Sequence, residues 1–142
     1  MTDGKQPLMQ ILLVEDSLAD VEMTLDALQD SKIANEVTVI RDGAAALEHL
    51  RSSADHVPDL VILDLNLPRL SGHEVLEAMQ TDDVLRRIPV AVLTTSSAET
   101  DVLKTYDLGA NCFLTKPVDV DQFIHVVQSI EDFWLGLVRL PK

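Results

Sequence analysis

Cysteine, basic side chains and long apolar runs are all scarce in this chain, and each scarcity excludes a class of protein. Cys112 is the single cysteine, so neither an internal disulfide nor a cysteine-based zinc cage can form. No apolar run approaches the roughly 18 residues that a membrane-spanning helix needs. Residues 1–7 lack the basic and apolar regions of a secretion signal. These features predict a cytoplasmic protein that does not act at a membrane.

The shortage of basic residues also bears on partners. The chain has 11 lysine and arginine residues against 24 aspartate and glutamate residues, which gives a formal net charge of −13. Because nucleic-acid phosphates are bound through clustered Lys and Arg, we do not expect direct nucleic-acid binding. A basic or cation-mediated partner suits this charge, and solubility alone would account for it equally well.

Short β-rich runs alternate with stretches of helical periodicity along the chain. Strands are expected at 9–14, 36–40, 59–63, 90–93 and 112–115. Helices are expected at about 18–30, around Ala46, Leu47 and Leu50, at 74–80, at 99–108 before Gly109, and from about 120 to beyond Trp134. Five βα units in succession predict an α/β fold, a doubly wound parallel five-stranded sheet with right-handed crossovers. One domain over 1–142 is expected, with a core at about 9–129 and a C-terminal helical extension at 130–142.

Polar side chains end four of the five expected strands, namely Glu15-Asp16, Asp64, Thr94-Thr95 and Lys116. The carboxyl ends of parallel strands share one edge of the sheet, where ligands of such folds bind, so these groups can converge. Acids gathered there raise one another's pKa or require a divalent cation. Mg²⁺ takes carboxylate, carbonyl and water oxygens, which Asp16, Asp64 and the Asn66 backbone carbonyl could supply in part.

A carboxylate beside Mg²⁺, an ammonium and a hydroxyl is suited to attack on phosphorus. The metal and Lys116 would stabilise charge on the equatorial oxygens, and Thr94 would hydrogen-bond one of them. Aspartate is an established phosphoryl acceptor. The chain has no Gly-rich phosphate loop, no Gly-x-Ser-x-Gly elbow and no His-Glu-x-x-His motif.

These residues resemble the receiver domain of two-component response regulators. The matching positions are Glu15-Asp16, Asp64 with Leu67-Pro68 and Gly72, Thr94, and Lys116-Pro117. The resemblance covers about residues 9–129 and implies a flavodoxin-like receiver topology. It also implies a signalling protein of a phosphorelay. Such a protein catalyses only its own phosphorylation and dephosphorylation and is otherwise not an enzyme.

The resemblance further implies a role for each matching residue. Asp64 would accept a phosphoryl group from a histidine kinase. Asp16, Asp64 and the Asn66 carbonyl would hold Mg²⁺, with Glu15 reaching the metal directly or through water. Thr94, which the spacing to Lys116 favours over Thr95, would contact the phosphoryl oxygens together with Lys116. Phe113 would be a switch aromatic that turns into the space Thr94 vacates, although ordinary core packing explains it as well.

The C-terminal segment narrows the resemblance. Phe133-Trp134 and residues 135–141 extend the last helix beyond the usual receiver boundary. Together with Leu93-Thr94-Thr95-Ser96, this is similar to stand-alone regulators paired with bacterial phytochrome histidine kinases. Such a relationship implies light signalling and a homodimer whose interface includes Phe133 and Trp134. The alternative is that this aromatic pair folds back on its own domain.

Two other functions use a similar sheet. A haloacid-dehalogenase-type Mg²⁺-dependent phosphatase needs a second aspartate two residues after the nucleophile, where this chain has Asn66, which cannot exchange a proton. A flavodoxin-like redox carrier would need a hydroxyl- and Gly-rich phosphate loop after the first strand. This chain has Glu15-Asp16-Ser17-Leu18 there. Multiple turnover on a phosphate ester would favour the first alternative, and a coloured protein the second.

Overall fold

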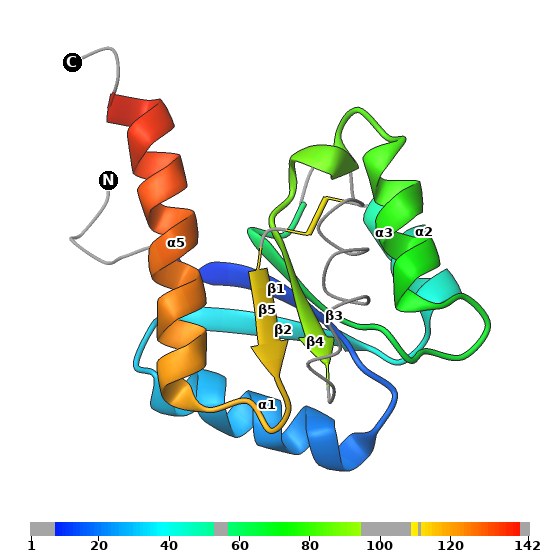
Figure 1. Cartoon of the computed structure of the whole chain (residues 1–142), viewed down its shortest axis with the longest axis horizontal. Coiled ribbons are helices and arrows are strands. Elements are labelled where there is room, and N and C mark those ends of the chain that lie inside the picture. Colours follow the sequence, from blue (N-terminus) through cyan, green and yellow to red (C-terminus); the bar gives the residue numbers. More distant parts are fainter. Residues whose placement is uncertain (1–7, 53–56, 95–108, 111, 140–142) are drawn as a thin grey trace.

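Five parallel strands form a single sheet at the centre of the molecule (Figure 1). The computed structural model describes residues 8–52, 57–94, 109–110 and 112–139, and for 131–139 it describes the backbone alone. The strand order is β2-β1-β3-β4-β5. The strands are β1 (Met9–Val14), β2 (Asn35–Ile40), β3 (Leu60–Asp64), β4 (Val90–Thr94) and β5 (Cys112–Thr115). This confirms the predicted doubly wound α/β fold.

Helices cover both faces of the sheet. They are α1 (Leu18–Asp30), α2 (Gly43–Ser52), α3 (Gly72–Gln80) and α5 (Val120–Arg139), with a short 3₁₀ helix at Leu85–Arg87. Helices α1 and α5 lie on one face, and α2 and α3 on the other (Figure 1). The expected helix at 99–108 falls outside the described residues. None of the described helices has the length and apolar character needed to cross a membrane.

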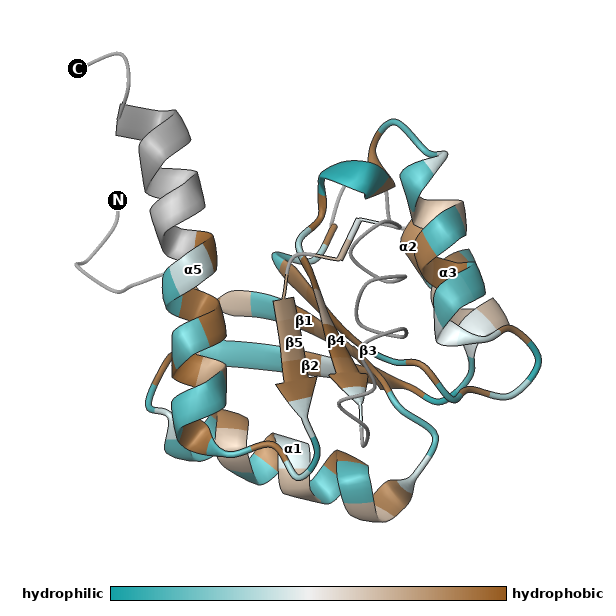
Figure 2. Cartoon of the chain, in the orientation of Figure 1, coloured by the Kyte–Doolittle hydropathy of each residue, from teal (hydrophilic) through white to brown (hydrophobic). Residues whose placement is uncertain are grey.

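The apolar pattern of the strands explains the two layers of core. Every residue of β3 and β4 is buried, as expected for central strands covered on both faces. Alternate residues serve opposite faces, so that Leu63 packs toward α2 and α3 while Ile62 packs toward α1 and α5. Figure 2 shows the apolar colouring concentrated on the inner strands and on the helix faces turned toward them.

Most predicted boundaries agree with the structure, and the differences have local causes. β3 and β4 each run one residue further than expected and include Asp64 and Thr94. Helix α3 begins at Gly72 because Ser71 and Glu74 form a reciprocal capping box ahead of its apolar face. Gly109 has φ of 100°, which suits the helix-ending role predicted for it.

Gly72 lets α3 start directly against the end of β3. A Cβ at this position would overlap the backbone carbonyl oxygen of Asp64, and the Gly72 N–H donates to the Leu65 carbonyl at 3.0 Å. Only glycine allows this approach without moving backbone. The β3–α3 loop is therefore held close to the strand end that carries Asp64.

Candidate functional site

The carboxyl edge of the sheet gathers Glu15, Asp64, Thr94 and Lys116. Glu15 follows β1, Asp64 and Thr94 end β3 and β4, and Lys116 follows β5. The register places Asp64 opposite Leu93 in the parallel ladder, so these strand ends lie level. Glu15 is 0% exposed, Asp64 3% and Thr94 9%. Such burial is unusual for ionisable side chains and requires a compensating charge.

Lys116 supplies that charge. Its Nζ lies 2.8 Å from Glu15 Oε2, 3.1 Å from Asp20 Oδ2 and 3.2 Å from Asp64 Oδ2. Burial alone would lower the pKa of Lys116, but these carboxylates outweigh burial and raise it above its ordinary value. The ammonium therefore stays charged in the described site. The Lys116–Pro117 peptide bond is cis.

Glu15 has one oxygen with incomplete partners. Its Oε1 accepts a hydrogen bond from the Ser17 backbone N–H at 3.0 Å. Its Oε2 makes the ion pair with Lys116 but no hydrogen bond. Burial is the main cause that raises the pKa of Glu15, and the nearby Asp64 adds to it, while Lys116 and Ser17 act in the opposite direction. The Lys116 ammonium offsets part of the cost of burying this carboxylate, and a second cation at the edge would offset more.

Asp64 is held from two sides. Its Oδ1 accepts the Asn66 backbone N–H at 3.3 Å, and its Oδ2 faces the Lys116 ammonium. The Asn66 residue itself is exposed in the loop that follows β3. The Asp64 carboxylate is thus oriented by the loop that follows it, and its charge is balanced by the ammonium of Lys116, which follows β5.

Asp16 differs from its neighbour Glu15. The residue is exposed, and the contact that the structure gives it is through its backbone carbonyl, which accepts from Arg41 Nη2 at 3.1 Å. Its carboxylate does not take part in the ion pairs around Lys116. Among the described residues, no three His, Cys, Asp or Glu side chains form a metal cage on their own. A cation at this edge would need backbone and water oxygens as well, as Mg²⁺ commonly does.

Of the other residues that the sequence singled out, the structure places the side chain of Phe113. Phe113 is half-buried on β5, opposite Val92, and packs against the core layer beneath α2 and α3. Thr95 and Ser96 lie outside the described residues, and Phe133 and Trp134 lie in the part of α5 described by its backbone.

Asp20 is a site residue that the strand-end pattern misses. It stands at the third position of α1, where Ser17 Oγ accepts its backbone N–H at 3.3 Å. Side chains in a helix lean toward its N-terminus, and α1 begins at the carboxyl edge of the sheet. An acidic residue in the first turn of the helix that follows β1 is therefore the sequence feature that could have identified Asp20.

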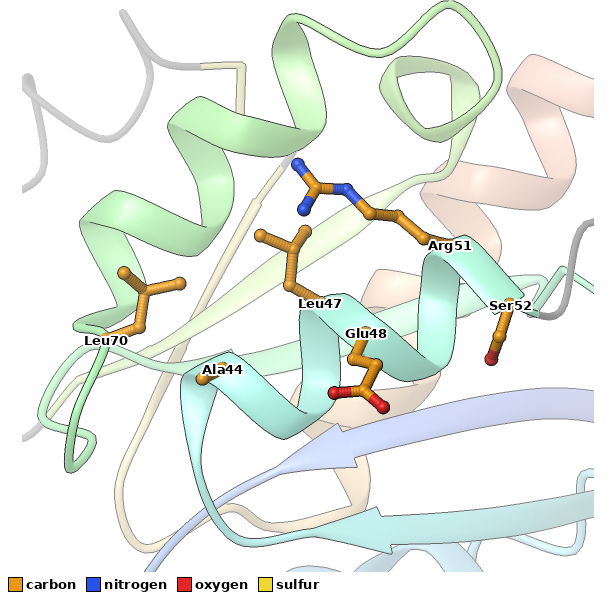
Figure 3. A pocket seen from close by; sticks show the side chains of 6 residues that line it. All are labelled: Ala44, Leu47, Glu48, Arg51, Ser52 and Leu70. Carbon is orange, nitrogen blue, oxygen red and sulfur yellow. The ribbon is translucent and has the colours of Figure 1, made fainter.

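A separate pocket of about 580 Å³ lies along α2, beside Leu70 of the loop that leads into α3 (Figure 3). Its lining residues are Ala44, Leu47, Glu48, Arg51, Ser52 and Leu70. None of these residues belongs to the ion-pair cluster around Lys116. The pocket is wide open to solvent, and it adds nothing to the chemistry at the strand ends.

Comparison with known proteins places this geometry in context. The family described as the response regulator receiver domain matches residues 11–128. Response regulator Rcp1 of Synechocystis sp. is 44% identical over 99% of this chain and 99% of its own length. The Mn²⁺-bound form of response regulator Rcp1 is 44% identical, covers 89% of this chain and 94% of its own, and has a TM-score of 0.71.

Two further solved structures are similar. The phosphorylated cyanobacterial phytochrome response regulator RcpA is 43% identical, with a TM-score of 0.74 over 92% of this chain and 96% of its own. The bacteriophytochrome response regulator RtBRR is 45% identical, with a TM-score of 0.79 over 87% of this chain and 78% of its own.

Proposed function

Because the chain belongs to the family of response regulator receiver domains, we propose that Asp64 accepts a phosphoryl group from a histidine kinase. The observation that carries this assignment is the contact of 3.2 Å between Asp64 Oδ2 and Lys116 Nζ at the carboxyl edge. An Asp64 oxygen forms a bond to phosphorus while the bond from phosphorus to the kinase histidine breaks. The histidine nitrogen keeps the electron pair of that bond and takes up a proton.

Lys116 stabilises the charge that reaches Asp64. Its side chain is 11% exposed, and its raised pKa keeps it protonated, so it acts in a partly dry environment. Thr94, at the end of the neighbouring strand, donates its hydroxyl to a phosphoryl oxygen. The Lys116 ammonium already lies beside Asp64 before the phosphoryl group arrives, which is how preorganised electrostatic stabilisation operates.

The same edge fits Mg²⁺. Three carboxylates surround the single Lys116 ammonium, which leaves an excess of negative charge when all are ionised. Asp16, Asp64 and the Asn66 backbone carbonyl would hold the ion, and Glu15 would reach it directly or through water. The buried Glu15 Oε2 without a hydrogen bond supports this set, as does the Mn²⁺-bound form of Rcp1. When bound, Mg²⁺ neutralises charge on the transferring phosphoryl oxygens.

Thr94 and Phe113 form the switch. Thr94 moves toward the phosphoryl group, and Phe113 turns into the space that it leaves. The two residues lie on adjacent paired strands, and Phe113 is half-buried at the border of the core layer beneath α2 and α3. Phosphorylation at Asp64 then biases a surface near β5 between two states.

The partner proposed here is a phytochrome-type histidine kinase, and the active form a homodimer. Similarity to RcpA and RtBRR supports the kinase. Helix α5 continues to Arg139, past residue 128 where the family match ends, and projects beyond the sheet (Figure 1). Phe133 and Trp134 lie on this projecting part and form the dimer interface. The chain works as one receiver unit that signals by protein contact.

The acceptor assignment is tested with acetyl phosphate and Mg²⁺. The wild-type chain is expected to gain the mass of one phosphoryl group, and chelation of Mg²⁺ is expected to abolish the gain. Asp64→Asn should gain none, because the amide is no nucleophile for phosphorus. Asp83→Asn, the same change at a side chain that is 91% exposed, is the matched control and should behave as wild type.

Two results would contradict the proposal. One is phosphorylation of the Asp64→Asn protein at the wild-type rate. The other is multiple turnover of a generic phosphate ester, which would indicate a phosphatase instead.

A further inference from the structure

The Lys116 ammonium is hydrogen-bonded to a residue outside the set of strand-end groups. Asp20 Oδ2 accepts from Lys116 Nζ at 3.1 Å across 96 positions of sequence. The same ammonium lies 2.8 Å from Glu15 Oε2 and 3.2 Å from Asp64 Oδ2, so Asp20 shares it with two acids of the strand ends.

Asp20 is a rigid support for this contact. It lies in the first turn of α1, where Ser17 caps the helix, and Val21 beside it is buried against the sheet. The Asp20 side chain is 31% exposed, so its charge is only partly screened by water. Lysine has a long, flexible side chain that loses much rotamer freedom when it is held in one position. A helix-borne carboxylate can supply that restraint.

The three carboxylates around Lys116 have different tasks in the proposed function. Asp64 receives the phosphoryl group, and Glu15 faces the cation. Asp20 is the one carboxylate of the three that contacts neither the phosphoryl group nor the cation in this proposal. Its contact with Lys116 can therefore persist throughout the reaction. We propose that Asp20 is a positioning residue that holds the Lys116 ammonium beside Asp64 for the incoming phosphoryl group. This inference rests on the proposed function of Asp64.

The test compares three variants in the full chain. Asp20→Ala removes the acceptor, Asp20→Asn keeps an oxygen acceptor without the charge, and Asp26→Ala removes an exposed acid from the same helix. At saturating Mg²⁺ and acetyl phosphate, Asp20→Ala should be phosphorylated roughly tenfold more slowly than wild type. Asp20→Asn should retain the rate within about threefold, and Asp26→Ala should match wild type.

A second readout does not depend on phosphorylation. In protein labelled with ¹⁵N-lysine, the Lys116 ammonium of wild type and Asp26→Ala should give a resonance typical of a restrained, hydrogen-bonded group. In Asp20→Ala this resonance should broaden or move to the position of solvent-exposed lysines. If Asp20→Ala fails to fold by circular dichroism, Asp20→Ser is measured instead, since its hydroxyl is too short to reach Lys116 and keeps a polar first turn.

Defined results overturn the inference. An unchanged Lys116 resonance in Asp20→Ala, or phosphorylation as fast as in Asp26→Ala, would show that Asp20 does not position the ammonium. Faster phosphorylation would mean that Asp20 competes with the phosphoryl group for Lys116, which also contradicts the inference. Failure of the wild-type chain to be phosphorylated would instead refute the role of Asp64, while the resonance would still report on Asp20.

Discussion

At the scale of single residues, the site depends on close approaches that leave no spare volume. The backbone of Gly72 lies against the Asp64 carbonyl oxygen, and the Gly72 N–H donates a hydrogen bond to the Leu65 carbonyl. The obstacle to a side chain here is backbone, which cannot rotate away as a side chain can. A side chain at Gly72, which starts α3, would therefore displace the backbone of Asp64, which ends β3.

Gly72→Ala should destabilise the chain by about 1–3 kcal/mol, the usual cost of overpacking. The added Cβ would push the first turn of α3 away from β3. Urea unfolding measures the change, with Glu77→Ala on the exposed side of α3 as the control that should stay near wild type. A Gly72→Ala protein as stable as the control would mean that the β3–α3 loop yields easily.

At the scale of elements, Asp42 fixes the start of helix α2, which follows a loop. Asp42 Oδ1 accepts the Ala45 backbone N–H at 2.7 Å, and its Oδ2 pairs with Arg69 Nη2 at 2.7 Å. These contacts, with the Ala45 hydrogen bond the largest, lower the pKa of Asp42. Arg69 belongs to the β3–α3 loop, where its backbone has φ of 66°. The Asp42–Arg69 pair thus joins the start of α2 to the loop beside Asp64.

The lowered pKa of Asp42 predicts how stability depends on pH. A carboxyl whose pKa is lower in the folded state stabilises the fold above its unfolded pKa, about 3.9. This contribution is lost as the pH falls through the lower folded value. The difference in unfolding free energy between wild type and Asp42→Ala should therefore be constant above about pH 5 and shrink in more acidic solution. Denaturant unfolding across this range measures it, and a constant difference down to the acid limit would contradict the assignment.

At the scale of the whole molecule, the sheet is covered on both faces, while the end of α5 stands apart from it (Figure 1). The buried part of this helix includes Phe123, Val126 and Val127. The helix then continues to Arg139. In the proposed dimer, the same helix of a second copy of the chain would cover the aromatic pair Phe133-Trp134.

If the proposed homodimer forms through this helix, replacing both Phe133 and Trp134 by alanine should leave the chain monomeric. Sedimentation velocity at micromolar concentration, with and without beryllofluoride, measures the mass in solution. Gln128→Ala, an exposed position on the same helix, is the control and should sediment as wild type. A double variant that still sediments as a dimer would exclude this interface.

The local sequence determined the elements and the edge at which the site forms. The apolar runs Ile11–Val14 and Cys112–Leu114 predict β1 and β5, and the expected bounds of both strands agree with the structure, because strands of a parallel sheet need such runs. Helix α3 starts earlier than its apolar spacing indicates, since Ser71 and Glu74 set the start by capping. Strand-end polarity then predicts that Glu15, Asp64 and Lys116 share one edge.

Tertiary structure alone decided which acids meet the ammonium. From the sequence, Asp16 is expected to ligate the cation and Glu15 to reach it directly or through water. In the structure, Glu15 is buried and pairs with Lys116, and Asp16 is exposed. Asp20, from the next helix, takes the hydrogen bond instead. The direction of a side chain beyond a strand end depends on the loop that follows and on the helix packed over it. These are long-range contacts, which no local pattern of residues encodes.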